Sequence, residues 1–198
     1  MFIQVLQGHT HDAEGLRAQL EDWVGKQSEA AAGWLGMTTG VSADNEFIAV
    51  VRFEDEAAAR RNSERVEQGE WWQATERLFD GPVDFHDYAH TDLLLGGGSD
   101  AAGFVQLIQG EYTGEISPAL SDEDAAALSM LRPEVIGGTV GWDDGGHFTQ
   151  TVYFTSEEDA RTGERAMAEN ADARAMMEAW QASITEVRYF DLQDPLMA

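Results

Sequence analysis

The chain has 198 residues, and 12 lysines and arginines against 37 aspartates and glutamates leave a formal charge of −25. A surface this acidic repels phosphate backbones and anionic lipid headgroups, so we expect neither nucleic acid nor a membrane as a partner. The absence of cysteine excludes disulfides, thiolate metal ligands and cysteine nucleophiles.

The first residues do not resemble a secretory signal, because no basic region precedes their short apolar run. No apolar stretch approaches the roughly 20 residues that span a bilayer. We therefore expect a cytoplasmic protein.

The first half of the chain predicts the element order β-α-β-β-α-β. Apolar residues at helical spacing predict a first helix, and Asp55 is placed to cap a second helix that Gly69 interrupts. The expected strands are residues 2–7, 34–41, 46–53 and 83–88, and the first helix is expected over 12–32.

The second half repeats the first. The segment FIQVLQG returns as FVQLIQG at an offset of 102, and FIAVVRFEDEAAAR is answered by FTQTVYFTSEEDAR at an offset of 101. A one-residue gap between the copies belongs at a loop or helix end. Capping boxes are predicted at Ser121 and Ser156, and a final strand over 184–190.

These copies define the domain organisation. We predict one repeat over residues 1–92, a Gly-rich linker over 93–103 and a second repeat over 104–198. The element order is that of the ferredoxin-like fold, whose sheet carries both helices on one face. The predicted class is therefore α+β, with tandem ferredoxin-like repeats packed sheet to sheet.

The sequence resembles the antibiotic-biosynthesis-monooxygenase-like group of dimeric α/β-barrel proteins. The resemblance rests on FIAVVRFEDEAAAR, on the EWWQATERLF helix and on the last strand with its HDY. It implies an intramolecular dimeric α/β barrel formed by two fused copies. That group includes cofactor-independent oxygenases of polycyclic phenols and haem-degrading oxygenases. The haem degraders bind iron through a histidine on the second helix, and neither 55–80 nor 156–183 contains one, which counts against haem. The sequence has no nucleotide-binding or flavin fingerprint either, so we expect no cofactor.

The last strand of the first repeat supplies candidate catalytic residues. Asp84, His86 and Tyr88 alternate onto one face of that strand, where His86 is a candidate general base that either Tyr88 or Asp84 orients. A solvated edge face is the competing interpretation.

The second helical region supplies candidate substrate-binding residues. In the group that the sequence resembles, the place where Trp71 and Trp72 stand often lines the cavity. Trp71 shares an apolar stripe with Leu78 and is expected in the core, whereas Trp72 is turned about 100° away and is the candidate wall of a pocket. Asn62 lies upstream and is a candidate hydrogen-bond donor to a ligand. Packing aromatics and a solvated amide are the alternatives.

The histidines near the first strand do not predict a metal centre. His9 and His11 form an H-x-H pair, but a site needs further ligands and His90 is the only other nearby candidate in the sequence. We therefore expect no metal.

The leading functional hypothesis is a cofactor-independent monooxygenase-like protein that acts on a small aromatic or polyketide-type molecule. The alternative is a non-catalytic protein that binds small hydrophobic molecules or serves assembly. The expected oligomeric state is a pseudo-dimeric monomer or a homodimer.

Overall fold

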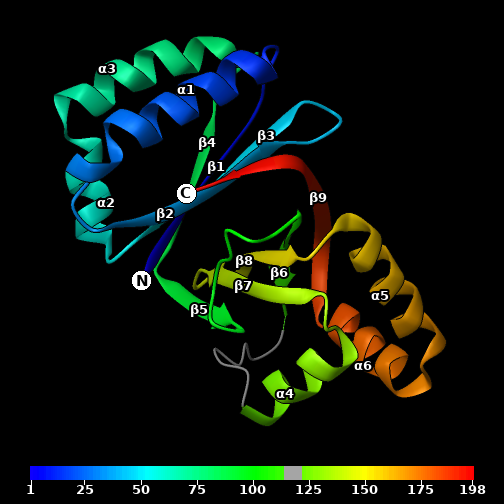
Figure 1. Ribbon diagram of the computed structural model, residues 1–198. Helices are drawn as coiled ribbons and strands as arrows, with labels where there is room; N and C mark the ends of the chain where they lie inside the picture. Colours follow the sequence, from blue (N-terminus) through cyan, green and yellow to red (C-terminus); the bar gives the residue numbers. More distant parts are fainter. Residues whose placement is uncertain (114–121) are drawn as a thin grey trace. The chain divides into compact units, whose positions relative to one another are not determined.

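The computed structural model describes residues 1–113 and 122–198 (Figure 1). It divides into two compact units, unit 1 with residues 1–90 and 192–198, and unit 2 with residues 91–191. Each is an α+β unit in which strands form an antiparallel ferredoxin-like sheet with helices. The tandem ferredoxin-like repeats predicted from the sequence are confirmed.

Unit 1 follows the predicted element order. Its elements are β1 (Phe2–His9), α1 (Ala13–Lys26), a 3-10 turn η1 (Ser28–Ala30), β2 (Trp34–Val41), β3 (Glu46–Phe53), α2 (Glu56–Ser63), α3 (Val66–Thr75), a 3-10 turn η2 (Glu76–Leu78) and β4 (Asp84–Tyr88). The strands lie in the order β4-β1-β3-β2, and β1 pairs antiparallel with both β3 and β4.

Two helix boundaries differ from the prediction. Helix α1 ends at Lys26, and a 3-10 turn replaces its expected last residues. The second helical region breaks at Glu64 and Arg65, where Arg65 is extended, and not at Gly69, which lies inside α3. A glycine costs a helix only about 1 kcal/mol, which is too little to end it when neighbouring residues pack.

Unit 2 repeats this arrangement. Its elements are β5 (His90–Leu94), β6 (Phe104–Tyr112), α4 (Asp122–Leu131), β7 (Val135–Trp142), β8 (His147–Phe154), α5 (Glu157–Glu169), α6 (Ala171–Ala182) and β9 (Ile184–Met197). Unit 2 contains β5 from residue 91 onward and β9 up to residue 191. The strand order is β9-β6-β8-β7-β5. Ser156 caps α5 by accepting a hydrogen bond from the backbone of Asp159, whereas the box at Ser121 lies outside the described residues.

Strand β9 is longer than predicted and belongs to both units. Its residues up to 191 lie beside β6, and those from 192 lie beside β2, where the backbones of Met37 and Ala198 exchange two hydrogen bonds. Pro195 is tolerated there because it lies between Gln193 and Leu196, where the register of the pairing with β2 shifts. The C-terminal residues thus complete the sheet of unit 1, as β5 completes that of unit 2.

The sheet of unit 1 is apolar on both faces. Phe47, Ala49 and Phe79 belong to the core under the helices. The alternate residues Ile3 and Ile48 point to the opposite face and are at most 1% exposed. Among the described helices, none combines the length and the apolar character needed to cross a bilayer.

Candidate functional site

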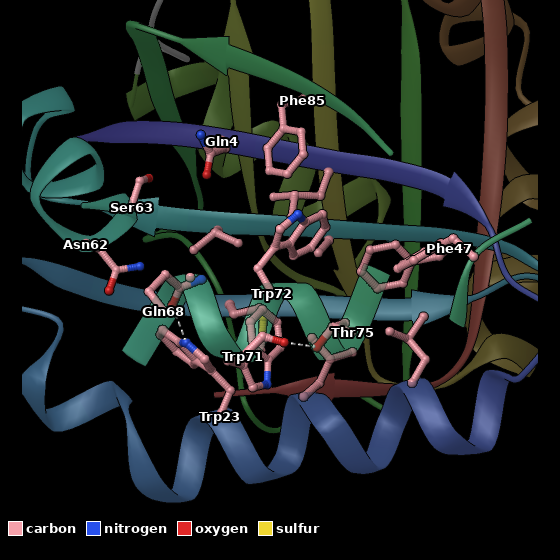
Figure 2. Close-up of a pocket in the computed structure, with 18 of the residues that line it drawn as sticks. Gln4, Trp23, Phe47, Asn62, Ser63, Gln68, Trp71, Trp72, Thr75 and Phe85 are labelled. Carbon is pink, nitrogen blue, oxygen red and sulfur yellow. Dashed lines mark hydrogen bonds between the residues drawn. The ribbon is translucent and has the colours of Figure 1, made fainter. Parts of the chain in front are cut away.

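A cavity of about 230 Å³ lies in unit 1 between the sheet and the helices α1 and α3 (Figure 2). Strands β1 and β3 contribute its floor, and the two helices with the end of α2 contribute its walls. The residues that line it are Gln4, Leu6, Leu16, Leu20, Trp23, Met37, Phe47, Ala49, Val51, Phe53, Asn62, Ser63, Gln68, Gly69, Trp71, Trp72, Thr75, Phe79 and Phe85.

Aromatic side chains form much of the wall. Trp71 packs into the core, and its indole nitrogen donates a hydrogen bond to the carbonyl of Gln19 over 3.0 Å. Trp72 lies with its ring centre 6.4 Å from Phe79 and 5.2 Å from Phe85. Phe85 is 51% exposed, so the Trp72–Phe85 pair forms the solvent side of the cavity.

The end of α2 contributes a buried amide. Asn62 is 8% exposed, and its Oδ1 accepts a hydrogen bond from the Arg65 guanidinium over 3.0 Å. Because a guanidinium only donates, the amide oxygen must face Arg65. The NH₂ group of Asn62 is therefore turned toward the cavity, as Figure 2 shows.

Two further amides of the lining are likewise oriented by hydrogen bonds to neighbouring side chains. Gln68 accepts a hydrogen bond at Oε1 from the indole of Trp23 over 2.6 Å, which leaves its NH₂ group for the cavity. Gln4 donates from Nε2 to the carboxylate of Asp87 over 2.8 Å, which leaves its carbonyl oxygen for the cavity. Figure 2 shows this oxygen pointing inward. One end of the cavity thus presents two amide donors and one acceptor.

None of the residues that line this cavity carries an ionisable side chain. A charged ligand would lose its hydration without gaining an opposite charge, which is costly in an apolar site. The arrangement therefore favours a neutral aromatic molecule with one oxygen substituent at the amide end.

The structure brings Asn62 and Trp72 to one cavity and places His86 and Tyr88 elsewhere. Phe85 lines the cavity, so by strand alternation its neighbour His86 and the side chain of Tyr88 lie on the other face of β4. The rings of His86 and Tyr88 are 4.5 Å apart between centres, and Tyr88 is only 3% exposed.

Sequence reasoning missed the carboxylate that holds the H-x-H pair. His9 and His11 each contact one oxygen of Asp80 through Nδ1, both at 3.0 Å. The hydrogen bond from His9, with that from His11, lowers the pKa of Asp80 from its ordinary value. Asp80 lies about 70 residues after His9 and His11 in the chain, so no local sequence pattern predicts that it contacts them. Within the described residues, no group of three or more potential ligands is arranged for a metal.

Comparison with known proteins bears on the fold. No family model matches the chain, and no curated protein matches it. Among solved structures, a "putative monooxygenase" from Lactobacillus acidophilus has a TM-score of 0.69 at 11% identity, with 100% of this chain and 95% of that chain covered. A "putative monooxygenase" from Fusobacterium nucleatum has a TM-score of 0.72 at 9% identity, with coverages of 99% and 93%.

A third solved structure, described as an anthrone oxidase-like protein, has a TM-score of 0.59 at 15% identity and covers 100% of this chain and 93% of that chain. At such identities the likeness concerns the fold. The resemblance noted in the sequence is thereby confirmed at that level: the chain has the fold of these monooxygenase-like proteins over its whole length, as two fused ferredoxin-like repeats.

Proposed function

We propose that the protein is a cofactor-independent monooxygenase-like protein that acts on a small, neutral, hydroxylated aromatic molecule in the cavity of unit 1. The observation that carries the proposal is the amide end of that cavity, where Asn62 and Gln68 present NH₂ groups and Gln4 presents a carbonyl. Two donors suit an oxygen that gains negative charge, and aromatic walls suit the rest of the molecule.

The cavity volume sets the size of the ligand. A cavity of about 150 Å³ binds a single benzene ring, so about 230 Å³ suits two fused rings. 1-Naphthol has this size and carries one hydroxyl group. It is therefore the probe that matches both the volume and the polar end.

The expected reaction is 1-naphthol plus O₂ giving 1,4-naphthoquinone plus water. The naphtholate, ionised at its O–H, carries negative charge to C4, where a C–O bond to dioxygen forms. Loss of the C4 hydrogen and cleavage of the O–O bond then release water, and the four electrons that the ring loses reduce O₂. Asn62 and Gln68 would stabilise the naphtholate oxygen once the O–H proton has passed to solvent.

The names of the solved structures with this fold support the monooxygenase-like assignment. One specific observation favours a non-catalytic binder as a second candidate, because no residue that lines the cavity can serve as a base. His86 and Tyr88 enter the proposal only as a separate site, for a ligand bound on the opposite face of β4.

The experiment measures 1-naphthol binding by tryptophan fluorescence and its turnover by oxygen uptake. Asn62→Leu keeps the side-chain size and removes the donor, and should weaken binding about tenfold, the equivalent of one hydrogen bond. Gln73→Leu, an exposed amide on α3 outside the lining, is the matched control. Binding of 1-naphthol without oxygen uptake would favour the non-catalytic binding protein. If Asn62→Leu bound 1-naphthol as tightly as the wild type does, the proposed binding site would be refuted.

A further inference from the structure

The cavity of unit 1 opens to solvent between β4 and the end of α2. Among the described residues that line it, Phe85 of β4 and Ser63 at the end of α2 are the exposed ones. Figure 2 shows both side chains, with Gln4 between them, along the side of the cavity that faces away from α1. The Trp72–Phe85 pair borders this opening on one side, and Ser63 borders it on the other. We call the opening the entrance.

Gly69 lies at this entrance. It belongs to α3 and precedes Trp72 by three residues, and residues three apart are neighbours on the surface of a helix. Both residues line the cavity, and Gly69 is partly exposed. A Cβ added at Gly69 would meet no atom within 4 Å. Because Trp72 borders the entrance, the open space beside the Cα of Gly69 belongs to it.

Neither the backbone nor the packing requires a glycine at this position. The N–H of Gly69 donates to the carbonyl of Arg65 over 3.1 Å, as in an ordinary helix, and its φ angle is not positive. No other chain segment comes close enough to exclude a side chain. Glycine is also among the least favourable residues in a helix interior. What it provides here is space, and glycine is the residue that lets a ligand come close to a backbone.

The two repeats differ at this position together with the tryptophan. At the offset of 102, Ala171 stands at the position of Gly69, and Arg174 stands at that of Trp72. Ala171 does not line the cavity of unit 2, which measures about 1110 Å³, so a methyl group there blocks nothing. In unit 1, where Trp72 borders a cavity of about 230 Å³, the position carries no side chain.

We propose that Gly69 is a specificity-determining residue that controls entry into the unit 1 cavity. A molecule passes between the Trp72–Phe85 pair and Ser63, beside the Cα of Gly69, and the absent side chain sets the width that can pass. Gly69 acts on the rate of entry and on the size admitted, whereas the amide end holds the molecule once it is inside. The entrance follows from the geometry, and it rests on the proposed function only for the choice of 1-naphthol as the ligand.

The first test measures access without a ligand. Acrylamide is small, neutral and needs no binding site, and Trp23, Trp71 and Trp72 line the cavity, so acrylamide quenching of tryptophan fluorescence reports entry. Gly69→Leu in the full chain should lower the quenching constant, because a leucine side chain occupies the entrance. Gly25→Leu, at an exposed position of α1 outside the lining, is the matched control and should be quenched as the wild type is.

Melting temperatures separate a blocked entrance from a disturbed fold. Both variants should melt at a higher temperature than the wild type, since leucine favours a helix more than glycine does. A disturbed fold would instead melt earlier and expose tryptophans to acrylamide. Gly69→Leu should therefore combine a lower quenching constant with a higher melting temperature.

The second test follows 1-naphthol by stopped-flow fluorescence. In Gly69→Leu the association and dissociation rate constants should both fall about tenfold, because an obstacle at an entrance slows both directions equally. The dissociation constant should then stay within about twofold of wild type. Gly69→Ala should give intermediate rates. If the wild type fails to bind 1-naphthol, the proposed function is wrong, while acrylamide quenching still decides the entrance.

The proposal would be overturned if Gly69→Leu were quenched by acrylamide like the wild type, or if Gly25→Leu lost quenching equally. Unchanged association of 1-naphthol with Gly69→Leu would also overturn it. Faster dissociation in that case would mean that Gly69 borders the bound molecule instead of its path.

Discussion

The guanidinium of Arg65 donates a hydrogen bond to Oδ1 of Asn62 over 3.0 Å, and this contact decides which end of the Asn62 amide meets a ligand. Arg65 also donates to the carbonyl of Gln27 over 3.3 Å, so it is held from two sides. It acts on the cavity without lining it.

Replacing Arg65 should therefore weaken ligand binding indirectly. In Arg65→Met the Asn62 amide loses its orienting partner, and we expect the dissociation constant for 1-naphthol to rise by about three- to tenfold. Isothermal titration calorimetry measures this, with Arg61→Met on the exposed side of α2 as the control. Equal affinity in the two variants would mean that Asn62 needs no orienting partner.

Oxygen uptake should increase with pH between 7 and 9. Since no lining residue of the unit 1 cavity is ionisable, the naphtholate must form by loss of its proton to solvent, and phenols ionise in the alkaline range, near 10 for tyrosine. Initial rates of oxygen consumption at saturating 1-naphthol give the profile. A bell-shaped profile centred near neutral pH would instead reveal a protein base.

His86→Ala tests the alternative site on β4. A general base must lie within hydrogen-bond reach of the proton that it removes, and His86 does not line the cavity. We expect 1-naphthol binding and oxygen uptake within twofold of wild type. Loss of uptake with intact binding would transfer the reactive site to the face that carries His86 and Tyr88.

Asp80→Asn should lower the melting temperature at pH 7. The pKa of Asp80 is depressed in the folded protein by hydrogen bonds from His9 and His11, so its carboxylate stabilises the fold above its unfolded pKa of about 3.9. This stabilisation is lost as pH falls through the folded pKa. The difference from wild type should therefore shrink below pH 4, whereas Asp84→Asn, an exposed residue of β4, should change little at any pH.

Gly163→Ala should destabilise the protein by about 3 kcal/mol. A Cβ at this position would lie 1.8 Å from Oε1 of Glu134, whose side chain is 9% exposed and paired with Arg132. The carboxylate cannot move aside without breaking this buried pair, which is costly. Urea unfolding measures the change. Gly25→Ala in α1 should instead stabilise the protein, because its Cβ would meet no atom within 4 Å and alanine favours the helix.

Much of the architecture follows from local patterns. The alternation of apolar residues and the caps predict each element from neighbouring residues, and the internal repeat shows that the same set of elements occurs twice. Helical spacing together with the family resemblance singled out Asn62 and Trp72. Strand alternation grouped His86 with Tyr88 on one face of β4, but it contains no information on which face the helices cover.

Other features depend on contacts between residues distant in the chain. The Gln4–Asp87 hydrogen bond joins residues 83 positions apart, and Asp80 meets the His9 and His11 pair across about 70. Residues 192–197 pair with β2 because the edge of a sheet has backbone N–H and C=O groups without hydrogen-bond partners. The periodicity of residues 192–197 does not reveal this pairing. The sequence by itself determined the elements and their order, and only the tertiary structure decided which amide ends meet in a cavity and how much space the helices leave there.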